Sequence, residues 1–194
     1  MTARATFLRW LATFPAFPLG GLLAVTLVGS ITDPVRGALA GLVAGLLIGL
    51  AQWLALRPSG IGPGWVVVTT VAVAAGSSLS AALTGAGTTS SDLVVSGLVA
   101  GTLVGAGQAL VARTSPLAVA AWTGLVAAAW GLAWFVTSNV IVDAGRGYVM
   151  FGSSGAVLAT ILTGMLVRRL VVPPGEGHRT TARPAATTGT EGAR

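Results

Sequence analysis

Charged residues are rare along this chain and lie in short breaks between long apolar segments. Only 8% of the 194 residues are charged and 54% are hydrophobic, whereas a soluble domain carries about 25% charged residues. A folded surface with so little charge would be poorly solvated by water but well solvated by a lipid bilayer. This feature therefore predicts a polytopic membrane protein.

The apolar segments number six, at residues 10–31, 36–56, 64–84, 93–112, 117–140 and 148–167. Each is long enough to cross a hydrocarbon core of about 30 Å at about 1.5 Å per residue. The breaks between them contain Gly, Pro and small polar residues, which are typical of turns. We therefore expect an all-α transmembrane helix bundle of about six spans within residues 1–172, followed by a disordered tail over 173–194.

The arginines indicate an orientation in the membrane. If the chain has six spans, nine of its eleven basic residues fall on one side of the bilayer. They are Arg4, Arg9, Arg57, Arg113, Arg168, Arg169, Arg179, Arg183 and Arg194. The positive-inside rule then predicts cytoplasmic termini in a cell inner (plasma) membrane. The same rule accounts for the net charge of +6, so we expect lipid rather than nucleic acid as the partner. The tail arginines could also contact anionic lipid headgroups.

The first apolar segment has two interpretations. Basic residues followed by an apolar run are typical of a secretory signal peptide. However, Pro15 and Pro18 interrupt the run, and no good small-residue cleavage motif follows. We therefore favour a retained first span that is kinked near its cytoplasmic end.

One stretch of the sequence occurs twice. Residues 41–57 (GLVAGLLIGLAQWLALR) and 97–113 (GLVAGTLVGAGQALVAR) are identical at ten of 17 positions. A weaker third copy is visible near 152–168, with small residues at spacing four. Glycines at this spacing share one helix face and allow close backbone approach between membrane helices. The sequence thus predicts parallel two-helix repeats, with packing glycines at Gly41, Gly45, Gly49, Gly97, Gly101, Gly105, Gly152 and Gly164.

The pattern G-x-x-x-G-x-x-x-G-x-x-Q-W-x-x-L-R at residues 41–57 resembles that of a loosely defined group of small bacterial membrane proteins. The copy at 97–113 has Ala109 in place of the tryptophan. The resemblance covers mainly the second and fourth spans. It implies a multi-helix membrane fold and no known activity.

Several uncharged polar and aromatic side chains could line a path or a pocket. The candidates are Gln52, Gln108, Trp130, Trp134 and Asn139. For the glutamines the alternative is a hydrogen bond between helices, and for the tryptophans it is plain packing bulk. Hydroxyls of the third span, such as Ser77 and Ser80, can line a polar path or bond to their own backbone. Tryptophans 10, 53, 65 and 122 are expected in an aromatic belt at the headgroup level.

The acidic residues near the outer side are Asp33, Asp92 and Asp143. They could bind a cation, but capping of helix N-termini is the simpler expectation. The chain has no cysteine, and its one histidine, His178, lies in the tail. We therefore assign no catalytic, cofactor-binding or metal-binding residue and expect no cofactor.

These observations favour a structural, accessory or assembly role in the membrane rather than an enzyme. The expected partners are the lipid bilayer and either a second copy of the chain or another membrane protein. A passive transporter or channel for a small neutral or lipidic solute is the first alternative. A membrane-bound enzyme that acts on an apolar substrate is the second, although intramembrane ionisable groups, which such chemistry usually needs, are missing from the spans.

Overall fold

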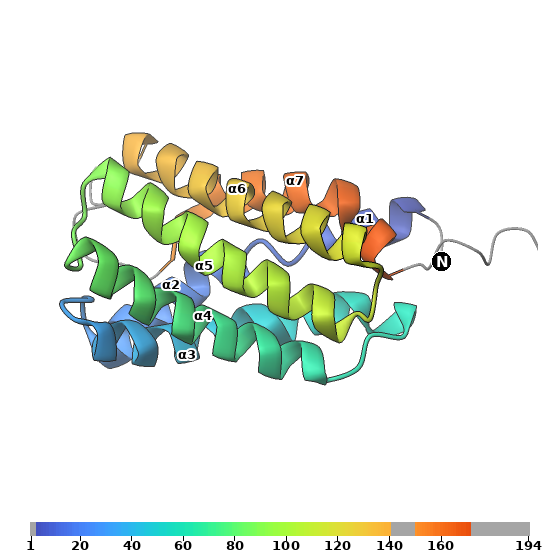
Figure 1. Ribbon diagram of the computed structural model, residues 1–194, viewed down its shortest axis with the longest axis horizontal. Helices are drawn as coiled ribbons and strands as arrows, with labels where there is room; N and C mark the ends of the chain where they lie inside the picture. The colour runs from blue at the N-terminus through green and yellow to red at the C-terminus, as the bar shows by residue number, and fades with distance from the viewer. Residues whose placement is uncertain (1–2, 141–149, 172–194) are drawn as a thin grey trace, which may run out of the picture.

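The computed structural model describes residues 3–140 and 150–171, and within these ranges all regular structure is helical. In chain order the helices are α1 Ala3–Leu11, α2 Ala16–Val28, α3 Pro34–Leu56, α4 Gly64–Thr84, α5 Ser90–Val111, α6 Pro116–Val140 and α7 Ser153–Val171 (Figure 1). A short 3₁₀ turn, η1, covers Arg57–Ser59. The tail predicted as disordered lies outside the described residues.

Five stretches of the described chain are long and apolar enough to cross a membrane. They are Arg4–Val28, Pro34–Ser59, Gly64–Thr84, Ser90–Val111 and Pro116–Val140, and Ser153–Val167 is a shorter apolar helix. The predicted all-α bundle of about six spans is therefore confirmed, and the chain has the architecture of a multi-pass membrane protein. α3, α4, α5 and α6 begin and end within three residues of the predicted limits.

The first and last spans differ from the prediction. The first begins near Arg4 rather than at residue 10, and it is broken into α1 and α2 at Pro15. Pro18 lies in the first turn of α2, where a missing N–H leaves no helical hydrogen bond unmade. The last helix begins at Ser153 rather than at residue 148, so Gly152 precedes the helix and the prediction of a ladder position there is wrong.

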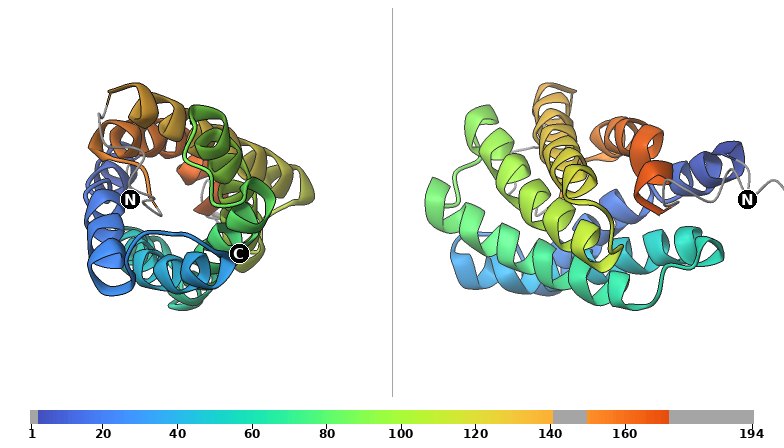
Figure 2. Two further views of the ribbon diagram at one scale, coloured as in Figure 1. Left: turned by 90° about the vertical axis from the view of Figure 1, so that its left-hand side faces the viewer. Right: turned by 45° about the vertical axis from the view of Figure 1, so that its right-hand side comes forward.

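The helices form a closed ring. Each long helix packs against its neighbours in the chain, and α7 packs against both α6 and α1. Figure 2 (left) looks along the bundle from the end that carries the α2–α3 and α4–α5 loops and shows the ring. Aromatic side chains fill its centre. The following six are almost completely buried: Trp10, Phe17, Trp65, Trp122, Trp130 and Phe151.

Leucines cover the outside of the ring and small residues lie inside it. On α3, Leu39, Leu46 and Leu54 are exposed, whereas Ala40 and Ala44 are buried. In water an outer face of this kind would be an aggregation-prone patch. In a bilayer it is the surface that contacts lipid, so the distribution agrees with the membrane-spanning helices.

Candidate functional site

The first glycine ladder holds α3 directly against the backbone of α4. A methyl group on Gly41 would lie 2.6 Å from Ala74 Cα, and one on Gly45 would lie 2.9 Å from Thr70 Cα. At Gly49 the nearest atoms include Val66 Cα, at 3.2 Å. These distances leave no room for a side chain at the first two positions. The ladder is therefore occupied inside this chain rather than presented to a partner.

The second ladder holds α5 against α6 in the same way. Hypothetical methyl groups on Gly97, Gly101 and Gly105 would each lie 2.8 Å from a Cα atom of α6. Those atoms belong to Gly131, Ala127 and Thr123. Each contacted residue stands 57 positions after its counterpart on α4, so the correspondence extends beyond the stretch of matching sequence.

The third ladder is different. The close glycine contact of α7 with α6 is made by Gly155, which lies against Ala133 O and Thr137 Oγ1. Gly152 donates its backbone N–H to Thr137 Oγ1 at 3.2 Å from outside the helix. Gly164 faces Phe7 and Trp10. The predicted set of four equally spaced positions is thus not one packing face, because α7 starts five residues later than expected and lies between α6 and α1.

The two glutamines of the repeated stretch meet in the centre of the ring. Gln108 Nε2 donates to Gln52 Oε1 at 2.9 Å and to Thr69 Oγ1 at 3.1 Å. The indole Nε1 of Trp65 donates to Gln52 Oε1, and that of Trp122 donates to Gln108 Oε1, both at 3.2 Å. Both glutamines are at most 3% exposed. Four helices, α3 to α6, are therefore tied together by side-chain hydrogen bonds.

A third indole completes this arrangement. Trp10 Nε1 donates to Thr163 Oγ1 at 2.9 Å. The ring of Trp10 packs edge-on against Trp65 and Trp122, at centroid distances of 6.4 Å and 5.9 Å. We call these seven residues the indole–amide cluster: Trp10, Gln52, Trp65, Thr69, Gln108, Trp122 and Thr163.

The prediction of an aromatic belt is wrong for Trp10, Trp65 and Trp122, since all three are buried in the ring. Thr163 was missed as a functional candidate. A signal was present, because Thr163 follows Gln108 by nearly the same interval that separates Gln108 from Gln52. A threonine in place of the glutamine concealed it.

A cavity beside the two glutamines has a volume of about 10 Å³. Trp130 and Thr163 contribute to its wall. This volume is at the lower limit for one water molecule and is too small for an organic solute. The glutamines therefore contact each other and the indoles rather than a ligand-sized path.

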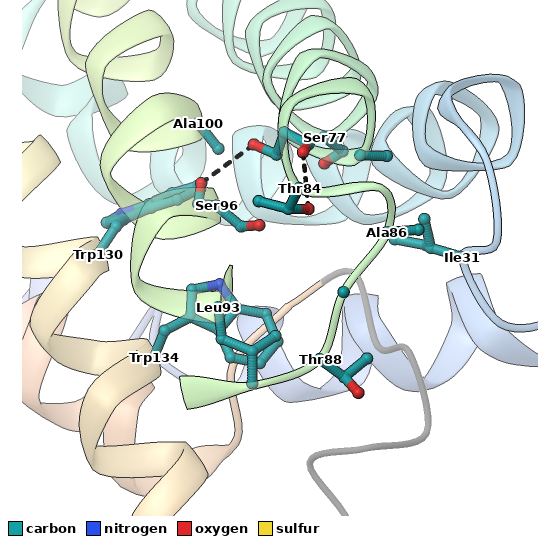
Figure 3. A pocket seen from close by; sticks show the side chains of 13 residues that line it. Ile31, Ser77, Thr84, Ala86, Thr88, Leu93, Ser96, Ala100, Trp130 and Trp134 are labelled. Atoms are coloured by element: carbon teal, nitrogen blue, oxygen red, sulfur yellow. Dashed lines mark hydrogen bonds between the residues drawn. The ribbon is translucent and has the colours of Figure 1, made fainter. Parts of the chain in front are cut away.

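A larger space of about 50 Å³ lies nearer the α4–α5 loop, between α4, α5 and α6 (Figure 3). We call it the hydroxyl pocket, after the side chains Ser77, Ser80, Thr84 and Ser96 in its wall, which Trp130 and Trp134 complete. Ser80 Oγ donates to Gly76 O at 2.6 Å, and Thr84 Oγ1 donates to Ser80 O at 2.9 Å. These two hydroxyls bond to their own helix, as expected for serine and threonine in apolar helices. Ser80 Oγ also makes a longer contact of 3.4 Å with Ser96 O on α5 (Figure 3).

Asn139 does not line either space. Its side chain is exposed and its Nδ2 donates to Phe135 O, one turn back on the same helix, at 2.7 Å. The prediction that Asn139 belongs to a polar lining is therefore wrong. Its amide instead bonds a backbone carbonyl in the last turn of α6.

Two of the three acidic residues stabilise helix N-termini. Asp33 caps α3 by accepting from Val35 N and Arg36 N, both at 2.9 Å. The hydrogen bond from the Arg36 backbone, with help from Thr32 and Val35, holds the pKa of the Asp33 carboxyl below its ordinary value. At α5 the N-cap is Thr89, and Asp92 forms the second half of a capping box with it.

Asp143 lies outside the described residues. Within the residues that the structure describes, no three acidic, histidine or cysteine side chains come together as a metal site would require. Comparisons with protein-family models, with curated proteins and with solved structures give no significant match.

Proposed function

We propose that this chain is a multi-pass protein of the inner membrane with a structural, accessory or assembly role rather than a catalytic one. The observation that carries the proposal is the indole–amide cluster, in which polar side chains from across the ring pair with one another. In a low-dielectric interior such pairing avoids the cost of unsatisfied polar groups and fixes a single arrangement. An arrangement of this kind suits a rigid scaffold better than an open path.

A partner would bind the outer face of the ring. The ladders of α3 and α5 are already covered by α4 and α6, so they are not available for association between chains. The exposed leucines of α3 remain, including Leu42 and Leu50. Association with a second copy or with another membrane protein would therefore displace lipid from this face.

The bundle is composed of three parallel two-helix units in this proposal. A methyl group on Gly20 of α2 would lie 3.2 Å from Ala44 Cα, and one on Gly76 of α4 would lie 2.6 Å from Ala100 Cα. Both residues of the second pair stand 56 positions after those of the first. The contact of Gly155 with Ala133 brings α6 and α7 together at the corresponding place. The support comes from these matched contacts and from the three indole-to-polar hydrogen bonds.

A passive transporter for a small neutral solute is the second candidate, and one observation favours it. Trp130 lines both the hydroxyl pocket and the cavity beside the glutamines. Movement of this one indole would connect the two spaces. The three indoles of the indole–amide cluster would still have to move before a solute could cross.

Solute flux into proteoliposomes distinguishes the two candidates. Vesicles containing the purified chain are mixed with glycerol or urea, and swelling is followed by light scattering. A scaffold gives the permeability of protein-free vesicles. Flux that depends on the protein and rises in Trp130→Ala, but not in the lipid-facing control Leu132→Ala, would support the transporter and contradict the scaffold.

The absence of cysteine from the sequence makes the topology directly testable. Ser90 is the first residue of α5, and Ser115 lies in the loop between the other end of α5 and α6. Both side chains are exposed. In intact cells we expect an impermeant maleimide to label Ser90→Cys, and to label Ser115→Cys only after permeabilisation. The reverse result would overturn the proposed cytoplasmic position of the termini.

A further inference from the structure

We propose that the hydroxyl pocket is a binding site for a small neutral molecule that carries a carbonyl or hydroxyl oxygen on a short apolar body. The site is independent of the scaffold role, because it uses none of the residues of the indole–amide cluster. The proposal rests on hydrogen-bonding groups that line this space and that the described chain leaves unpaired.

The first such group is the hydroxyl of Ser77. This side chain is 8% exposed, and in the described part of the chain its Oγ makes no hydrogen bond, unlike its pocket neighbours Ser80 and Thr84. A hydroxyl in an apolar helix usually bonds to the carbonyl one turn earlier. Among the described residues, the fully buried hydroxyl oxygens without a partner are those of Thr123 and Ser154. Ser77 Oγ is therefore open to the pocket rather than sealed inside the protein, and it can bond to a ligand there. The hydroxyl of Ser96, on the facing helix α5, is likewise unpaired among the described residues.

The second group comprises the indole N–H donors of Trp130 and Trp134, which are 3% and 4% exposed. Trp10, Trp53, Trp65 and Trp122 all donate to an oxygen. Trp130 and Trp134 donate to none within the described ranges. A buried indole N–H normally finds an acceptor. The two unpaired donors therefore select a ligand with an acceptor oxygen.

The walls of the pocket set the rest of the ligand's chemistry. Figure 3 shows the two indoles on one side of the space and the hydroxyl-bearing helix α4 on the other. Leu93 and Ile31 add apolar surface, and no charged side chain lines the described walls. An ion would lose its hydration here without gaining a counter-charge. The ligand is therefore neutral, with one polar end and one apolar end.

The size of the pocket limits the ligand to a few heavy atoms. Its volume of about 50 Å³ is roughly a third of that of the engineered cavity of about 150 Å³ that binds benzene. Four or five heavy atoms restrict the affinity, so we expect a dissociation constant of about 1 mM. The shared chemistry, a carbonyl oxygen on an apolar body, occurs both in free amides and in lipid esters.

The test is a titration of the full chain, labelled with 5-fluorotryptophan, by fluorine NMR. The probe is N-methylacetamide, and tetramethylammonium serves as a cation of similar size. We expect saturable shifts for the resonances of Trp130 and Trp134, assigned by substitution with phenylalanine, and none for Trp10, Trp65 and Trp122. Absence of a saturable shift, an equal shift of all resonances, or saturable binding of tetramethylammonium would overturn the proposal.

Substitutions locate the site and separate binding from folding. Ser77→Ala and Ser96→Ala should each weaken N-methylacetamide binding about 3- to 10-fold, which corresponds to the loss of one neutral hydrogen bond. Ser78→Ala is the matched control, since Ser78 neighbours Ser77 on α4 but does not line the pocket. Unchanged resonances of Trp65 and Trp122 show that a variant is folded. Equal affinity in all three folded variants would contradict the site.

A comparison of detergent with phospholipid nanodiscs shows whether the natural ligand is a free solute or a lipid ester. Equal affinity in ester-free detergent and in phospholipid nanodiscs indicates a site for a free solute. Binding in detergent that disappears in nanodiscs indicates that a lipid ester occupies the same groups. Both results support the proposed chemistry, and failure of binding in both environments contradicts it.

Discussion

The indole–amide cluster and the hydroxyl pocket are both polar regions inside the same ring of helices, yet one is closed and the other is open. In the cluster, the long side chains of Gln52 and Gln108 reach across the centre and bond to each other. In the pocket, the short hydroxyls of Ser80 and Thr84 bond back to their own helix, and the contact from Ser80 Oγ to Ser96 O on α5 is longer, at 3.4 Å. The long amide side chains meet across the ring at 2.9 Å, whereas the short Ser80 hydroxyl reaches the facing helix at 3.4 Å, so the length of the polar group decides how closely each region is filled.

The largest loss of stability should come from a substitution in the closed region, the indole–amide cluster. Gln108→Leu removes three hydrogen bonds and leaves the Trp122 N–H without its acceptor. We expect a loss of about 3 kcal/mol in unfolding free energy, because an unsatisfied buried donor is added to the lost bonds. The unfolding free energy is measured by titrating the protein in mixed micelles with dodecyl sulfate. Ser77→Ala, in the hydroxyl pocket, removes no hydrogen bond made within the described residues, so it should change the unfolding free energy by less than about 0.5 kcal/mol. Equal losses in the two variants would contradict the distinction between the two regions.

Close glycine contacts hold the helices together beside both regions. A side chain at one of these glycines should destabilise the protein, whichever region lies nearby. Gly97 lies beside the hydroxyl pocket, but a methyl group there would be 2.5 Å from Trp130 O, a backbone atom. The pocket cannot accommodate this methyl group, because the methyl group points at the backbone of α6. We therefore expect Gly97→Ala to lower the unfolding free energy by about 2 kcal/mol in the same assay. Gly124 has no atom near its methyl position, so Gly124→Ala should stabilise α6 by about 0.5–1 kcal/mol. If Gly97→Ala were as stable as Gly124→Ala, α5 and α6 would be able to move apart without cost, and the close glycine contact would not contribute to stability.

A smaller effect is expected from one position at which the helices packed against the two glycine ladders differ. Thr123 Oγ1 is buried without a hydrogen-bond partner, whereas the corresponding residue on α4 is Val66. Thr123→Val should therefore raise the unfolding free energy by about 1 kcal/mol. The reciprocal change Val66→Thr should lower it by a similar amount. Stabilisation by both changes, or by neither, would contradict the correspondence between the two helices.

The smallest effect concerns the loop end of the bundle. The lowered pKa of Asp33 means that its capping contribution is complete above the ordinary carboxyl pKa. It is lost as the pH falls through the lower, folded-state pKa. Relative to Asp33→Asn, which caps without titrating, the wild type should lose stability between about pH 5 and about pH 3. A constant difference over this range would show that the carboxylate has no role in capping.

Much of the fold could be predicted from the sequence. The limits of α4 agree with the prediction at both ends, because Gly64 and Gly85 mark them. The last helix was placed too early, since the apolar residues Met150 and Phe151 read as helix in a hydropathy pattern. In the structure both are buried against the ring and precede α7.

The candidate site was less predictable than the fold. The repeated stretch singled out Gln52 and Gln108, but nothing in the pattern indicated that they bond to each other. The tryptophans at 10, 65 and 122 were assigned to the membrane surface because of their position along each span. Their burial depends on which way each helix is rotated about its axis. In a membrane protein both the lipid-facing and the core-facing sides are apolar, so periodicity carries little information on rotation.

The sequence by itself determined that the chain has about six spans and where α3, α4, α5 and α6 begin and end to within three residues, since apolar runs and turn residues report directly on what a bilayer can solvate. It also determined the close-packing faces of α3 and α5, because glycine at spacing four is costly unless a neighbouring backbone uses it. The tertiary structure alone decided which polar side chains meet. Hydrogen bonds between helices depend on ångström-scale distances across the ring, and these are set by packing of all the helices together.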